Sequence, residues 1–228
     1  RTGCQWRYLP KDFPPKSTVW RYFDEWRHNG TRDTIPDRPR RKVRAAEKPY
    51  HPRTSASVDS PSVDTTSGGE QRGRDNAQDV DGRNRHIGVD SMGLLLAVLV
   101  TAGDVDDAQA ASELFGRLEG QPVGKVVRMD ADPESHNFDL SEGVESHARW
   151  DRTIVRRPTG TEGWVLLPIR GTVERTFAWL GRCRRLSKDR EKSVRSSESF
   201  VKRALIPLML NRLEPQQTDA ESHYRKVA

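Results

Sequence analysis

Cysteine is scarce in this chain of 228 residues, with Cys4 and Cys183 the two that occur. A pair so far apart excludes a disulfide framework and a thiolate zinc site, and it predicts a protein of the reducing cytoplasm. Long apolar runs are also missing. The longest runs from Met92 to Ala102 and is interrupted by Gly93 and Thr101, about half of the ~20 residues that a transmembrane helix needs. We therefore expect no membrane-spanning segment.

Apolar residues are few as well, at 33% of the chain, against about 45–50% in an ordinary soluble domain. Part of the chain is therefore expected to lie outside any packed core. The length suits one medium domain with a smaller one beside it. The sequence shows no signal peptide and begins with Arg1 rather than methionine.

Charge is abundant and unevenly distributed. Residues 32–53 hold eight basic residues against three acids, and residues 170–203 hold eleven against four. Between them, residues 55–110 hold ten acids against four basic residues. Two basic segments around an acidic one suit a protein that binds a polyanion at its flanks and does metal chemistry in the middle. On charge alone, a merely solvated surface explains the pattern equally well.

The first 54 residues predict one short helix and a linker. Pro14 and Pro15 end anything helical before them, Ser17 is a suitable cap, and Val19, Phe23 and Trp26 then share one face. Residues 31–54 carry four prolines among arginines, which favours a basic linker without regular structure. Residues 67–82 are polar and glycine-rich, and so are expected to form a loop.

The rest of the chain predicts a mixed α/β domain. Residues 86–89 and 94–100 read as a hairpin with Gly93 in its turn. The remaining expected elements are a helix over 107–118, strands over 125–129 and 153–155, and helices over 173–186 and 199–213. Strands alternating with helices in this way indicate a sheet flanked by helices.

Three acids stand at the ends or starts of these elements: Asp59, Asp130 and Glu174. Carboxylates in such places can converge in space, and oxygen ligands are what Mg²⁺ prefers. Two such ions can clamp the attacking and leaving oxygens of a phosphodiester. From the residues alone, capping or solvation explains these acids better. Asp90 is an alternative first acid and Asp132 an alternative second one.

Several segments together carry a family resemblance. They are RTGCQWRYLPKDFPPKSTVWRYFDEW at the start, VDSPSVDT (58–65), GRNRHIGVDSMGLLLAVLVTAGDVDD (82–107), VVRMDAD (126–132) and IVRRPTGTEGWVLLPIRGTVERTFAWLGRCRRLSKD (154–189). With them the chain resembles bacterial insertion-sequence transposases of the DDE type over residues 1–30 and 55–212. The first segment is similar to the N-terminal DNA-binding module of that group and the last to the surroundings of its catalytic glutamate.

The resemblance implies a metal-binding catalytic triad of Asp59, Asp130 and Glu174, with Mg²⁺ or Mn²⁺ as the cofactor. The family's Tyr-Arg-Glu-Lys signature has its arginine at Arg170, whereas Leu167 and Gly181 stand at its tyrosine and lysine positions. Other departures from the family pattern are Asp64, Asp81 and Pro133. DNA phosphates are expected to contact Arg40, Arg41, Lys42, Arg170, Arg175, Arg182, Arg184, Arg185 and Lys188.

The fold expected from the resemblance is α/β, an RNase H-like mixed sheet flanked by helices, with a partial N-terminal helical module. The expected parts are the truncated module (1–30), the basic linker (31–54), the catalytic domain (55–212) and a polar tail (213–228). The implied activity is cleavage and strand transfer of insertion-sequence ends by a homodimer on double-stranded DNA, in the bacterial cytoplasm at the nucleoid. The alternative is an inactive DNA-binding remnant that keeps the fold.

Overall fold

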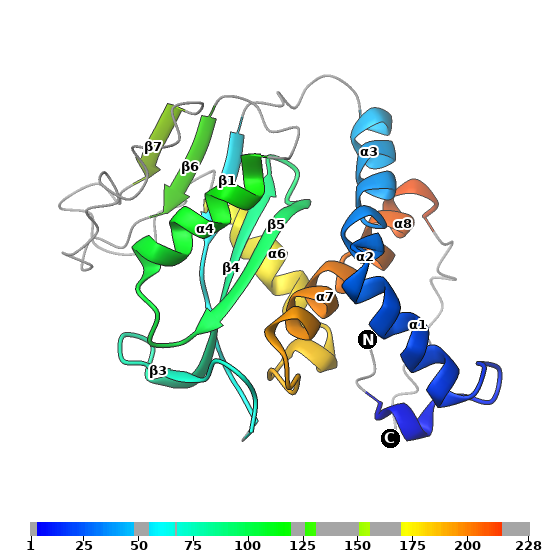
Figure 1. Ribbon diagram of the computed structural model, residues 1–228. Helices are drawn as coiled ribbons and strands as arrows, with labels where there is room; N and C mark the ends of the chain where they lie inside the picture. The colour runs from blue at the N-terminus through cyan, green and yellow to red at the C-terminus, as the bar shows by residue number, and fades with distance from the viewer. Residues whose placement is uncertain are drawn as a thin grey trace, which may run out of the picture.

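A mixed sheet with helices on both faces lies beside a group of N-terminal helices in the computed structural model (Figure 1). The structure describes residues 4–47, 55–66, 68–119, 126–130, 151–155 and 170–215. In this part of the chain, no helix is both long and apolar enough to cross a membrane.

The sheet has antiparallel strands at one side, where β2 and β3 also pair with β4, and parallel strands at the other. β4 pairs antiparallel with both β5 and β1, β1 runs parallel to β6, and β6 runs parallel to β7. This order, β5-β4-β1-β6-β7, is that of an RNase H-like sheet, and it confirms the expected fold class. The strands are β1 (Ser55–Asp59), β2 (Ser62–Asp64), β3 (Gly73–Asp75), β4 (Val80–Asp90), β5 (Leu95–Ala102), β6 (Val126–Asp130) and β7 (Asp151–Val155).

The helices fall into two groups. α4 covers one face of the sheet, while α6 and α7 cover the other, and α1 to α3 lie against α7 and α8 (Figure 1). The helices are η1 (Trp6–Tyr8), α1 (Lys16–His28), α2 (Thr31–Thr34), α3 (Asp37–Ala46), α4 (Asp107–Glu119), α6 (Arg170–Gly181), η2 (Arg184–Leu186), α7 (Val194–Ala204) and α8 (Ile206–Leu213).

Side chains of β5 alternate between two apolar cores, as the pleat of a strand requires. Ala97 and Leu99 pack with α4, in a cluster that contains Leu114 and Phe115. Val98 and Val100 instead belong to the cluster on the face of α6 and α7, made of Ile87, Val89, Val98, Val100, Val173, Leu180, Cys183, Leu186, Val201 and Leu205. β5 is therefore buried on both of its faces.

The β4–β5 hairpin forms as the sequence predicts. Gly93 has a φ of 75°, in the left-handed region that glycine adopts readily. A Cβ atom at this position would lie 2.9 Å from Thr176 Oγ1 and 3.2 Å from the Trp179 ring. The turn therefore needs glycine both for its backbone conformation and for its close approach to α6.

Local structure differs from the sequence prediction at five places. At one of them, the helix expected over 173–186, α6 ends at Gly181 and the short η2 follows after the extended Cys183. Residues 31–46 form α2 and α3, where no regular element is expected; Pro39 lies in the first turn of α3, where its missing N–H is no loss. α1 begins after Pro15, and Ser17 does not cap it. β3 and the start of β4 occupy part of the predicted loop over 67–82.

The fifth difference concerns the predicted C-terminal helix over 199–213. It is divided between α7 and α8, with the boundary at Leu205. Pro207 lies in the first turn of α8. A proline cannot donate to the preceding turn and its ring crowds the carbonyl four residues earlier, so a single continuous helix is not formed.

Candidate active site

Asp59 and Asp130 end two neighbouring parallel strands. The register of β1 and β6 pairs Val58 with Met129, so Asp59 and Asp130 are the next residues of these two strands. The Asp59 carboxylate accepts a hydrogen bond from the Ser60 backbone N–H at 2.8 Å and is partly buried. The side chain of Asp130 lies outside the described part of the structure. The strand ends therefore bring the two positions together at one edge of the sheet.

Alternation along β1 places the Asp59 side chain on the face that α6 covers. Val58 packs in the α4 cluster on the opposite face, and successive strand residues point to opposite faces. Asp59 is also the cross-strand partner of Ile87, which packs with Val173 of α6. Asp59 and α6 therefore share one side of the sheet.

Glu174 lies on α6 and is exposed to solvent. Its neighbour Val173 is fully buried, and through such contacts α6 packs against β1 and β4. Sheet and helix thus place Asp59 and Glu174 on adjacent elements of one face. Among the residues whose side chains the structure describes, no group of three metal-ligating side chains is present, and Asp130 is not among them.

The alternative acids have different positions. Asp90 lies in the β4–β5 turn, is 4% exposed, and accepts hydrogen bonds from the backbone N–H groups of Met92 and Leu94, each at 2.9 Å. Its other carboxylate oxygen pairs with Arg44. Asp90 is thus engaged by the turn and by Arg44, and Asp59 is kept as the proposed first acid. Asp132 lies outside the described residues.

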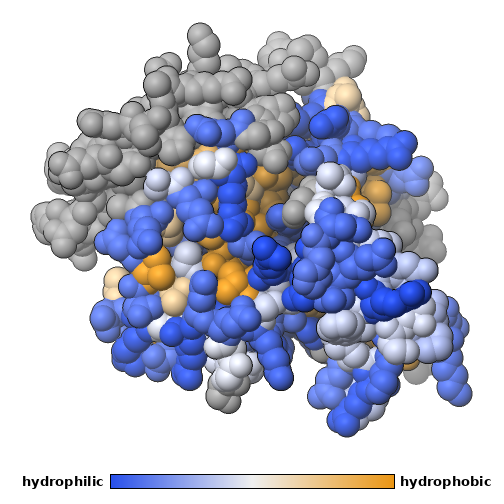
Figure 2. All heavy atoms as spheres, in the orientation of Figure 1, coloured by the Kyte–Doolittle hydropathy of each residue, from blue (hydrophilic) through white to orange (hydrophobic). Residues whose placement is uncertain are grey.

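Six of the nine basic residues expected to contact DNA are exposed, and one of them, Arg175, also contacts the β4–β5 turn. Arg182, Arg184 and Lys188 lie at and just after the end of α6, and Arg41 and Lys42 lie on α3. The Lys188 ammonium is 2.9 Å from an Asp64 carboxylate oxygen, and both side chains are about half exposed. Hydrophilic side chains also dominate the face of the molecule in Figure 2. These exposed residues are accessible to a phosphate backbone.

Three of the nine basic residues make contacts within the protein: the buried Arg40, the half-buried Arg185 and the exposed Arg175. Arg40 is 2% exposed, donates to Asp37 at 2.8 Å, and has its pKa lowered by burial. The prediction that Arg40 contacts DNA therefore does not fit its position. Arg185 pairs with Glu191 and stacks on Phe200. Arg175 is described with the β4–β5 turn below.

Arg170 begins α6, at the place in the chain expected for the arginine of the family signature. Its side chain lies outside the described part of the structure. Its expected contact with DNA therefore remains a prediction.

A buried ion pair that sequence reasoning missed supports the segment after α6. Arg83 is 0% exposed and Asp189 2%, with Arg83 Nη1 3.3 Å from Asp189 Oδ2. Arg83 also donates to the carbonyl oxygens of Glu70 and Glu191, at 2.9 Å each. Burial lowers the pKa of the neighbouring Arg85, which donates to the Leu186 carbonyl. An arginine inside a buried strand was the signal that could have found this pair.

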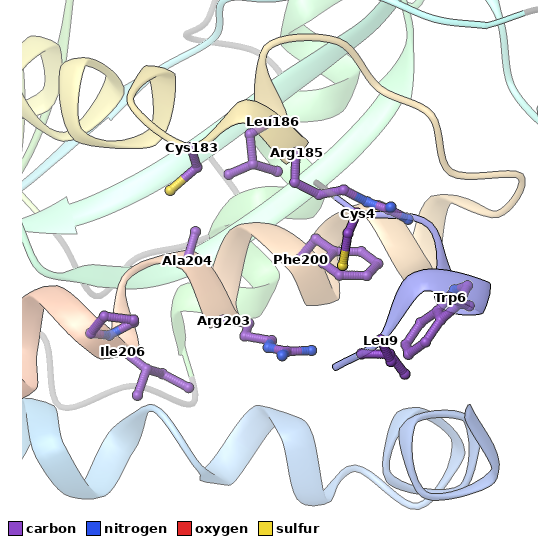
Figure 3. Close-up of a pocket in the computed structure, with 11 residues that line it drawn as sticks. Cys4, Trp6, Leu9, Cys183, Arg185, Leu186, Phe200, Arg203, Ala204 and Ile206 are labelled. Carbon is purple, nitrogen blue, oxygen red and sulfur yellow. The ribbon is translucent and has the colours of Figure 1, made fainter. Parts of the chain in front are cut away.

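A pocket lies between the N-terminal segment and the C-terminal elements (Figure 3). Its volume is about 360 Å³, and its lining includes Cys4 and Trp6 from the N-terminal segment, Cys183 after α6, and Phe200 and Arg203 from α7. Its walls are largely apolar. The pocket is therefore formed by N-terminal and C-terminal elements together, and its lining includes neither Asp59 nor Glu174.

Comparison with known families places the same segments in a functional context. The family model described as the transposase DDE domain matches residues 50–209. A second model, for transposases of the IS4/5 family, matches residues 1–35. A search of curated proteins finds no match to this sequence. The first match spans more than half of the chain and includes Asp59, Asp130 and Glu174.

Proposed function

The chain belongs to the family of DDE transposases, and we propose that it catalyses cleavage of insertion-sequence ends and their transfer to target DNA. The observation that carries this proposal is the parallel pairing of β1 with β6, at whose carboxyl ends Asp59 and Asp130 lie. α6, which carries Glu174, covers the same face as Asp59. These are the three acids proposed for catalysis.

The donor set fits a hard divalent cation. Three carboxylates supply oxygen ligands, and Mg²⁺ or Mn²⁺ accepts such ligands while keeping several waters. Asp59, Asp130 and Glu174 would hold the metal. When bound, the metal would supply Lewis-acid stabilisation of the attacking and leaving oxygens of a phosphodiester.

Two displacements at phosphorus complete the proposed reaction. A water attacks the phosphodiester at the element's end, its oxygen joins phosphorus and its proton passes to solvent. The bond to the 3′ oxygen breaks, and that oxygen takes up a proton from solvent. The freed 3′ hydroxyl then attacks a phosphodiester of the target, loses its proton, and displaces the target's own 3′ oxygen as a new hydroxyl. Both steps depend on the three carboxylates, which would hold the metal, and neither needs an oxidant or a nucleotide.

Exposed cations near this face would hold the DNA backbone. Arg182 and Arg184 follow α6 directly, and the guanidinium fork suits phosphate. Such contacts fix the register of the duplex and carry little sequence information. Reading of the element ends is assigned to α1–α3, and the active form is proposed to be a homodimer on paired ends.

The test is a cleavage and strand-transfer assay on labelled element ends with Mg²⁺, comparing Glu174→Gln with the unchanged chain. The variant keeps the side chain's shape and removes one charged ligand, so cleavage should fall about 1,000-fold, as loss of several kcal/mol of metal stabilisation requires. DNA affinity should change less than twofold. Glu113→Gln, at an exposed residue of α4 on the opposite face of the sheet, is the matched control.

Two further variants distinguish Asp130 from Asp132 as the second catalytic acid. Asp130→Asn should abolish cleavage, whereas Asp132→Asn should leave it within a few-fold of the unchanged chain. Full activity of Glu174→Gln would overturn the site assignment. An unchanged chain that binds element ends tightly but cuts none of them would overturn the enzymatic proposal and identify a DNA-binding remnant.

A further inference from the structure

The turn between β4 and β5, residues Asp90–Leu94, contacts α6 next to Glu174. Arg175 donates to the Met92 carbonyl at 3.4 Å, and the Thr176 hydroxyl donates to the Gly93 carbonyl at 2.8 Å. These two residues directly follow Glu174 on the helix. The turn therefore holds α6 at the point where the proposed metal ligand projects.

A cation–aromatic stack extends this contact to α8. The guanidinium groups of Arg175 and Arg212 lie 5.3 and 5.0 Å from the centre of the Trp179 ring. Both arginines also donate to the Met92 carbonyl, at 3.4 and 3.5 Å. Such stacking contributes about 0.5–1 kcal/mol where it is exposed and more where it is shielded from water. α6, α8 and the turn thus form one connected unit.

The other side of the turn is held by α3. Asp90 uses one carboxylate oxygen to fix the turn through the Met92 and Leu94 N–H groups. Its second oxygen pairs with Arg44 of α3, whose side chain is 22% exposed against 5% for Asp90. Val43, the residue before Arg44, packs with Met92, Leu94 and Met209 in a small apolar cluster. Asp90 is therefore shared between the turn and the N-terminal helices.

Two arginines of α3 interact with the Asp90 carboxylate. Arg40 and Arg44 both face it from α3, and the favourable interaction with Asp90 acts on the Arg40 guanidinium as well. Removing Arg44 would leave a buried carboxylate with its nearest ion-pair partner lost, which is costly in a low-dielectric setting. The turn would then relax to hydrate or repair that charge.

We propose that Arg44 is a positioning residue for the active site: through Asp90 and the β4–β5 turn, it fixes the orientation of α6 and so of Glu174. This inference rests on the proposed function, because it gives Glu174 the role of a metal ligand. The N-terminal helices are assigned to recognition of the element ends. Through Arg44 and Asp90, their docking is therefore coupled to the position of the proposed metal ligand Glu174.

The test compares Arg44→Met, which keeps the apolar stem, with Arg44→Lys, which keeps the charge. In a cleavage assay titrated with Mg²⁺, Arg44→Met should raise the metal concentration for half-maximal rate about 10-fold, as loss of a residue that orients a metal ligand does. The rate at saturating metal should stay near that of the unchanged chain, and Arg44→Lys should restore the metal requirement. Arg74→Met removes two exposed ion pairs, with Asp79 and Asp81, in the β3–β4 hairpin and is the matched control.

Hydrogen exchange gives a readout that needs no activity. Amides of α6 should exchange faster in Arg44→Met than in Arg74→Met, while those of α4 on the opposite face stay unchanged. The positioning role would be overturned if the amides of α6 exchanged equally fast in the two variants. It would also be overturned if Arg44→Met lowered the cleavage rate without changing the Mg²⁺ concentration needed for half-maximal rate. If the unchanged chain cuts no DNA, the proposed function fails by itself, and the exchange of α6 still decides whether Arg44 holds the helix.

Discussion

The sheet and the N-terminal helices of this protein differ in how many apolar side chains they bury. Each face of the sheet buries its own apolar cluster, with Leu114 and Phe115 on one side and Ile87 and Val98 on the other. Across α1 to α3, by contrast, the buried apolar side chains are those of Phe23 and Val43. Nearby aromatic residues are 41–62% exposed: Tyr8, Phe13, Trp20, Tyr22 and Trp26.

This difference indicates which contacts stabilise the N-terminal helices. Phe23 lies between the rings of Trp6 and Phe200, with centroid distances of 5.3 and 5.2 Å, and Phe200 belongs to α7. Val43 packs against Met92 and Met209, again outside the N-terminal segment. Both buried anchors are therefore contacts with the rest of the chain, and the helices are held by docking rather than by a core of their own.

The largest expected effect is in the sheet. Asp189→Ala leaves Arg83 buried without its ion-pair partner, so we expect the free energy of unfolding to fall by about 3–5 kcal/mol. Urea unfolding followed by circular dichroism measures it. Glu113→Ala, which removes one partner of Arg117 on the exposed face of α4, should cost less than about 1 kcal/mol. An equal decrease in the free energy of unfolding in the two variants would contradict the claim that the buried Arg83–Asp189 pair stabilises the fold more than the exposed pair does.

The second effect separates the two regions directly. Phe23→Ala removes the aromatic anchor of α1, at a cost of about 3–4 kcal/mol, as for other buried phenylalanines. Because the helices depend on docking, this loss should appear as faster hydrogen exchange in α1–α3 with protection of β4 and β5 retained. Trp20→Ala, at a residue 47% exposed, should change exchange little. Simultaneous loss of protection in the sheet would show that the two regions unfold as one unit.

The third effect is a pH dependence confined to the sheet. Burial lowers the pKa of His86 to about 4, and its Nε2 lies 2.9 Å from Thr101 Oγ1. In the unfolded chain the imidazole takes up its proton near pH 6.5, so between about pH 6.5 and 4 the unfolded state binds more protons. The free energy of unfolding should therefore fall by up to about 3 kcal/mol as pH drops through this range.

The variant His86→Gln tests that contribution. It removes the titrating group and keeps a side chain that can hydrogen-bond to Thr101, so the slope of stability against pH between 6.5 and 4 should become smaller. The comparison uses urea unfolding at matched pH values. An unchanged slope would assign the acid sensitivity to carboxylates elsewhere in the molecule.

Prediction from sequence succeeded where apolar periodicity was strong. The β4–β5 hairpin with its turn at Gly93 was predicted, because β-branched runs on both sides of a turn are an explicit local signal. α3 was missed, because Val43 is its one apolar side chain facing a core and its proline lies in the first turn. Local patterns describe an element well when its own residues form the core, and poorly when it docks on others.

The candidate site shows the same limit. That Asp59 and Asp130 end neighbouring strands follows from sheet topology, which the family resemblance implied and composition alone did not. The roles of Asp90 and Arg83 depend on partners far away in sequence, Arg44 and Asp189. Such pairs are fixed by how the elements pack, and no local spacing reports them.

The smallest expected effect concerns DNA and sharpens the comparison of the two regions. If about six phosphates are neutralised, the logarithm of the binding constant should fall against the logarithm of salt concentration with a slope near −5. Arg182→Gln with Arg184→Gln removes two exposed cations beside the sheet, and Arg41→Gln with Lys42→Gln removes two on α3. Each pair should make the slope shallower by about 1.8, because each lost contact contributes about 0.9.

The two double variants discriminate between the regions because each removes two positive charges, one from the sheet domain and the other from the N-terminal helices. A shallower slope in both cases means that one continuous DNA path crosses the sheet domain and the N-terminal helices. A change limited to Arg182 and Arg184 confines backbone binding to the sheet domain and leaves α3 without a phosphate contact. Arg74→Gln, a single exposed cation in the β3 hairpin, controls for net charge. A flat titration for the unchanged chain would contradict DNA binding by either region, since counterion release makes salt dependence unavoidable for a protein that tracks phosphates.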